Sequence, residues 1–183
     1  MDLDLDLDLD YMLERLFEQQ NSRGLVRPDG FSVYGQPVLR RVPAGHEPQA
    51  LMDAKTIQRR LVECAHAVHA TSDGLCAGWV KQVFSSLGFG MLAGDAIDIY
   101  DGDCPYTDTA DLLVGMVVAT SREPYSADGR AYGHIGLYVG DGMVMDSAGG
   151  RVRRVPLELW LSAYGIMAPP RWGWLAGIAL DQM

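Results

Sequence analysis

The spacing of apolar residues changes once along the chain, and this change limits the folds it can adopt. Between residues 48 and 87 the apolar positions recur every three to four residues, the period of a helix packed on a core. Beyond residue 112 they form short runs separated by glycines, which is typical of strands joined by tight turns. Helices followed by strands predict an α+β domain, with N-terminal helices packed on a central antiparallel meander sheet.

Helix-capping residues and glycines set the expected limits of these elements. Ser72 and Asp73 are candidate caps for the start of a second helix, and Gly88 is suited to its end. The stretch between that helix and residue 112 is predicted to be rich in loops. The expected helices are Pro48–His69, Leu75–Leu87 and Leu157–Tyr164, and the expected strands are Leu112–Ala119, His134–Val139, Met143–Asp146, Val152–Val155 and Trp172–Leu175.

The first fifty residues differ in character from the rest. Residues 1–10 alternate aspartate and leucine, and because neighbouring carboxylates repel each other we expect a disordered acidic leader. Residues 11–50 are predicted to hold one amphipathic helix, near 11–20, and then an irregular extension rich in glycine and proline. The folded domain is expected to span 51–183.

Composition excludes several classes of function. The chain of 183 residues carries 24 acidic and 15 basic residues, a formal charge of -9, and has no basic stripe, so we expect no nucleic-acid partner. No apolar run approaches the roughly 18 to 20 residues that cross a bilayer, so we expect no membrane span. The first residues also lack the basic start and apolar core of a classical export signal.

Three cysteines, Cys64, Cys76 and Cys104, are an odd number and do not suggest a disulfide framework. Their wide separation gives no metal-ligand spacing, and no glycine-rich phosphate loop is present, so we expect neither a metal nor a cofactor. Cys76 falls in the first turn of a predicted helix, where the helix field favours a thiolate. It is therefore a candidate nucleophile; the competing interpretation is a small buried apolar residue.

A cysteine nucleophile needs a base, and His134 is the candidate because it opens a predicted strand directly after a glycine. Asp146 follows twelve residues later, across a predicted hairpin. A two-residue loop would turn Asp146 away from His134, whereas a three-residue loop over 140–142 would place it opposite Gly136, on the side of His134. The three-residue loop thus predicts an orienting carboxylate; otherwise Asp146 simply ends its strand.

Aromatic and basic residues near these positions are candidates for substrate contact. Trp79, Tyr132 and Tyr138 could line a binding surface. The competing interpretation is core packing for Trp79 and a half-buried sheet position for each tyrosine. A cluster of arginines at 151, 153 and 154 could meet a peptide carboxylate, or could be the solvated face of a strand.

Together these motifs resemble a known family. The segments Asp73-Gly-Leu-Cys-Ala-Gly-Trp-Val80, Val114-Gly-Met-Val-Val118, Gly133-His-Ile-Gly-Leu-Tyr-Val-Gly-Asp-Gly142 and Met145-Asp146 are similar to those of the NlpC/P60 cysteine peptidases and their CHAP amidase relatives. The resemblance covers roughly residues 50 to 175. It implies a papain-like fold with the nucleophile at a helix N-terminus. An acidic third residue is more similar to the CHAP-like branch.

The resemblance implies that Cys76 is the nucleophile, His134 the general base and then acid, and Asp146 the orienting residue. The implied activity is hydrolysis of an amide bond in bacterial peptidoglycan peptides, as endopeptidase or amidase, at the cell wall. An inhibitor or immunity protein is a candidate partner. Alternative interpretations are a protein-directed cysteine protease, deamidase or acyltransferase on the same fold, and a catalytically silent binding domain.

Overall fold

A computed structural model describes residues 46–72 and 74–183 of the chain. The predicted leader, the predicted helix near 11–20 and Asp73 lie outside the described residues. No helix within those residues is long and apolar enough to span a bilayer.

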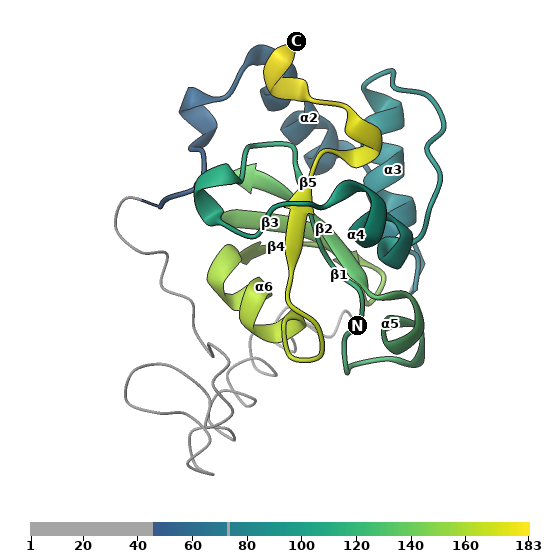
Figure 1. The fold of residues 1–183 in the computed structure, drawn as a ribbon. Coiled ribbons are helices and arrows are strands. Elements are labelled where there is room, and N and C mark those ends of the chain that lie inside the picture. The colour runs from purple at the N-terminus through teal and green to yellow at the C-terminus, as the bar shows by residue number, and fades with distance from the viewer. Residues whose placement is uncertain (1–45, 73) are drawn as a thin grey trace, which may run out of the picture.

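The core of the fold is a five-stranded antiparallel sheet with helices packed around it (Figure 1). Strands β1 to β4 form a meander, and β5 adds to the free edge of β1, so the order is β4-β3-β2-β1-β5. The predicted α+β class and antiparallel meander are therefore confirmed. The strands are β1 (Val117–Thr120), β2 (His134–Gly140), β3 (Met143–Ala148), β4 (Arg151–Pro156) and β5 (Arg171–Gly173).

Helices surround the sheet. Helix α3 contacts β2 and β3, α4 contacts β1 and β5, and α6 contacts β3 and β4 (Figure 1). The elements outside the sheet are η1 (Leu51–Asp53), α2 (Thr56–Ala67), α3 (Cys76–Ser86), α4 (Ala96–Asp103), η2 (Thr109–Asp111), α5 (Ala127–Tyr132), α6 (Leu157–Tyr164), η3 (Leu175–Gly177) and η4 (Leu180–Gln182).

The first predicted helix is shorter than expected because its initial residues bond elsewhere. The backbone N–H of Gln49 donates to the carbonyl of Leu112, and the Gln49 carbonyl accepts from the Tyr138 hydroxyl. The continuous helix begins only at Thr56, where the Gln58 side chain accepts from the N–H of Lys55. Gln49 thus packs on the domain. The predicted start of the domain at residue 51 stays a prediction.

Other boundaries were wrong for local reasons. The predicted strand over 112–119 is reduced to β1, because Gly115 has a φ of +91° that breaks the extended run. Helix α4 lies in the stretch predicted as loop: Asp95 is its N-cap, and the Asp98 carboxylate accepts from the Asp95 N–H. Helix α5 was not predicted at all; the hydroxyl of its N-cap, Ser126, accepts from the N–H of Gly129.

Candidate active site

Cys76 is the first residue of α3, as the sequence predicted, but the cap differs. The N-cap is Leu75, and no side chain caps this helix in the described residues, so the predicted cap by Ser72 is wrong. The segment that precedes α3 is instead hydrogen-bonded to the sheet. Thr71 donates its N–H to the Ser147 hydroxyl at 3.1 Å and its own hydroxyl to the Leu75 carbonyl at 2.8 Å. These bonds tie the start of α3 to β3, directly beside Asp146.

The β2–β3 hairpin places Asp146 opposite Gly136, which confirms the predicted pairing. The loop itself is the two-residue turn Asp141-Gly142, with both residues at positive φ, and not the three-residue loop we predicted. A bulge at Val139, between the pairs Tyr138–Val144 and Gly140–Met143, supplies the extra residue. The bulge thus restores the register that a plain two-residue turn would have lost.

Gly136 leaves the room that the site needs. A Cβ at this position would lie 2.6 Å from Val144 Cγ1 and 3.3 Å from the Cβ of Asp146. Any side chain here would therefore press on the strand that carries the carboxylate.

His134 and Asp146 form a buried pair. The Nε2–H of His134 donates to Oδ2 of Asp146 at 2.7 Å, and the Asp146 side chain is fully buried. Because Nε2 is used in this way, Nδ1 is the ring nitrogen available to the Cys76 thiol, which the imidazole faces. Three elements, α3, β2 and β3, thus bring the predicted trio together.

The protonation states follow from this arrangement. Burial alone would raise the pKa of the Cys76 thiol, but hydrogen bonding and charge from His134, together with the N–H groups of Ile135 and Ala77, lower it below the ordinary 9.0. Burial would lower the pKa of His134, yet the stacked Tyr164, Asp146 and Cys76 together raise it well above 6.5. Cys76 and His134 therefore favour a thiolate–imidazolium pair.

Two further side chains, those of Arg153 and Trp160, donate hydrogen bonds to Asp146. Arg153 donates Nε–H to Oδ1 at 2.8 Å and Nη2–H to Oδ2 at 2.6 Å, and the indole N–H of Trp160 donates to Oδ2 at 3.0 Å. Burial raises the pKa of this carboxyl, but the bonds and charges of His134 and Arg153 outweigh burial and hold the pKa well below 3.8. Asp146 is consequently an anion that only accepts hydrogen bonds.

Aromatic rings from α6 fix the plane of the imidazole. The ring of Tyr164 stacks on His134 with centroids 4.2 Å apart, and that of Trp160 lies 5.9 Å away. Neither residue was predicted as part of the site. Their i, i+4 spacing on a predicted helix was visible, but nothing in the sequence placed that helix against His134.

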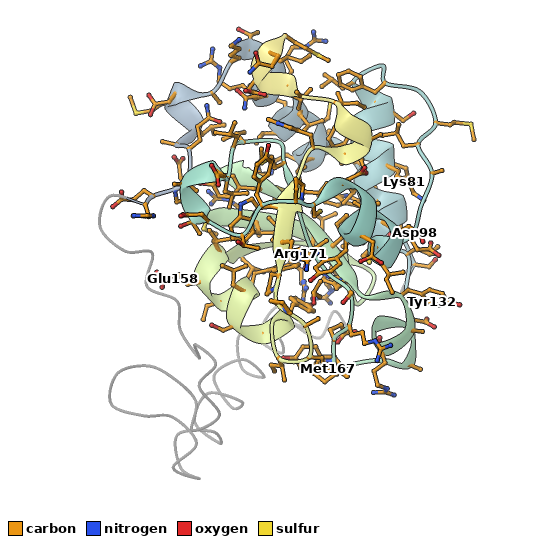
Figure 2. All side chains as sticks on the ribbon, in the orientation of Figure 1. Lys81, Asp98, Tyr132, Glu158, Met167 and Arg171 are labelled. Carbon is orange, nitrogen blue, oxygen red and sulfur yellow. The ribbon has the colours of Figure 1, made fainter. Side chains whose placement is uncertain are left out.

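Two of the three predicted substrate contacts lie in the core. Trp79 is fully buried and donates its indole N–H to the Val68 carbonyl, and Tyr138 is fully buried with its hydroxyl on Gln49. Both are packing residues, because no substrate can reach them in this fold. Tyr132, by contrast, is 51% exposed at the end of α5 and lies at the surface (Figure 2). It remains a candidate for substrate contact.

The other two cysteines are Cys64, which is half-buried, and Cys104. All three are free thiols, which agrees with the expectation that the chain has no disulfide framework. Cys104 is buried, and burial together with the charge of Asp103 raises the pKa of its thiol to about 12. Among the described residues no group of three or more His, Cys, Asp or Glu side chains is placed to hold a metal ion.

Comparisons with known proteins give limited matches. No protein-family model matches the chain, and no curated protein does. Among solved structures, NlpC2 of Trichomonas vaginalis is 17% identical with a TM-score of 0.48, over 67% of this chain and 48% of that one. NlpC1 of the same organism is 16% identical with a TM-score of 0.49, over 68% and 46%. The chain thus spans about half the length of these proteins.

Proposed function

We propose that this protein is a papain-like cysteine hydrolase that cleaves an amide bond, with Cys76 as nucleophile, His134 as base and acid, and Asp146 as orienting residue. One observation carries the proposal: a thiol at a helix start faces an imidazole whose other nitrogen is bonded to a buried carboxylate. A structural cysteine needs no such partners, whereas a nucleophile needs all of them.

The proposed reaction is acyl transfer in two steps. The Cys76 thiolate attacks the amide carbonyl, and N–H groups of the first turn of α3, which lack partners within the helix, stabilise the oxyanion. The His134 imidazolium then gives its proton to the leaving amine, so the C–N bond breaks and a thioester remains. Neutral His134 next takes a proton from water, whose oxygen attacks the thioester, and Cys76 leaves as the thiolate.

Asp146 keeps the imidazole in its reactive orientation. Its bond to Nε2–H leaves Nδ1 directed at the sulfur and the scissile amide. An acidic residue in this role favours a CHAP-like enzyme within the NlpC/P60 group, and peptidoglycan peptides are the proposed substrate.

Incubation of purified peptidoglycan with the wild-type protein tests this proposal. We expect soluble peptide fragments from wild type and none from Cys76→Ala, because alanine cannot form the thioester. Mass analysis of the fragments identifies the bond cleaved. If neither protein releases fragments, the proposed wall substrate is wrong; if both release equal amounts, Cys76 is not the nucleophile.

A further inference from the structure

Arg153 belongs to a buried cluster of charged groups together with Cys76, His134 and Asp146. Its neighbours on β4 face elsewhere. The sequence suggested that the three nearby arginines bind a peptide carboxylate or form a solvated face. Instead the Arg153 side chain is only 13% exposed and makes a forked contact with Asp146, the residue directly opposite it on β3. Its Nη2 also donates to the Tyr164 hydroxyl at 2.6 Å. Arg154, the next residue, is exposed.

The charges of the cluster balance only when Arg153 is counted. With the proposed thiolate on Cys76 and carboxylate on Asp146, the negative charges are matched by the His134 imidazolium and the Arg153 guanidinium. Without the guanidinium the buried group would carry one net negative charge. Because an uncompensated buried charge is costly, such a group lowers its free energy by taking up a proton.

We propose that Arg153 is a positioning residue whose guanidinium, acting through Asp146, supplies the counter-charge that lets Cys76 remain a thiolate at neutral pH. This inference rests on the proposed function. It assigns to Arg153 a share in setting the ionisation of a sulfur that it does not touch.

Other titratable groups near the cluster do not supply this charge. Tyr164 from α6 contributes a phenol, which accepts from Arg153 and stacks on His134. Behind it, Tyr125 packs edge-on to Tyr164 at 5.7 Å, and burial raises the pKa of the Tyr125 phenol. Glu123 is acidic, and its carboxylate accepts from the Tyr125 N–H and the Ser126 hydroxyl. Among these groups, Arg153 alone brings a second positive charge.

Arg153→Gln tests the inference, because glutamine can still donate to Asp146 but carries no charge. The ultraviolet absorbance of the Cys76 thiolate, taken as the difference from Cys76→Ala in the same background, is titrated against pH. We expect the thiol pKa to rise by about one unit or more, a tenfold loss of thiolate at a fixed acidic pH. Arg153→Lys, which keeps the charge, should stay close to wild type, and so should the control Arg154→Gln.

A second variant separates charge from fold. Arg153→Met, which is uncharged and of similar length, should raise the thiol pKa as Arg153→Gln does, so the inference stays testable even if one of the two variants is poorly folded. An unchanged titration in Arg153→Gln and Arg153→Met, or an equal shift in Arg154→Gln, would overturn the role of Arg153. An ordinary thiol pKa in the wild-type protein would instead contradict the proposed function itself.

Discussion

A His134→Ala variant is expected to hydrolyse the amide substrate at least about 10³-fold more slowly than wild type. Alanine removes both the partner that stabilises the Cys76 thiolate and the acid that protonates the leaving amine. The measurement is kcat from fragment release at a saturating concentration of substrate.

Two controls show whether this loss is specific. His66→Ala removes an exposed histidine near the end of α2 and should leave kcat unchanged. Because nucleophile and base act as a unit, the Cys76→Ala and His134→Ala double variant should be no slower than Cys76→Ala alone. Losses that multiply in the double variant would show that the two residues act independently, against the proposed mechanism.

Asp146→Ala is expected to reduce the free energy of unfolding by about 3–5 kcal/mol, the usual cost of removing one partner from a buried ion pair. The Arg153 guanidinium, the Trp160 indole N–H and His134 Nε2–H would each lose an acceptor in the interior. Chemical denaturation at neutral pH measures the loss. Asp111→Ala, at an exposed carboxylate on η2, is the matched control and should change stability by less than about 0.5 kcal/mol.

The stability difference between wild type and Asp146→Ala should also depend on pH. The pKa of Asp146 is lower in the folded protein than its ordinary 3.8, so the carboxylate stabilises the fold fully above that value and progressively less as pH falls below it. The difference should therefore shrink on acidification below about pH 4. A difference that is constant from neutral to strongly acid pH would show that Asp146 stabilises by packing and not by charge.

Much of the site could be predicted because its parts are local. Cys76 was placed by a helix start, and the pairing of Asp146 with Gly136 followed from the alternation of strand faces and the length of one hairpin. The predicted register of the hairpin is correct, but the predicted three-residue loop is wrong. A bulge at Val139 together with a two-residue turn aligns the strands as a three-residue loop would. Bulges have no reliable local signal, so this detail was outside what pattern alone supports.

Contacts between distant segments could not be predicted in the same way. Trp160 and Tyr164 reach His134 only because α6 packs against β3 and β4. Trp79 and Tyr138 have the composition of binding residues, and only the packing of the whole domain shows that they are core. Arg153 is an intermediate case, because a two-residue turn at Gly149-Gly150 is enough to pair Asp146 with Arg153 on the neighbouring strand.

Selective alkylation of Cys76 tests the central claim, that this thiol is activated by His134 and Asp146, most directly. Iodoacetamide is applied to the folded protein at about pH 6, where an ordinary thiol is almost fully protonated, and the modified sites are quantified by peptide mass analysis. Cys64 and Cys104 serve as internal controls. The predicted result is modification of Cys76 well before either of the others, lost in His134→Ala; modification of Cys76 no faster than that of Cys64, or unaffected by removal of His134, would contradict it.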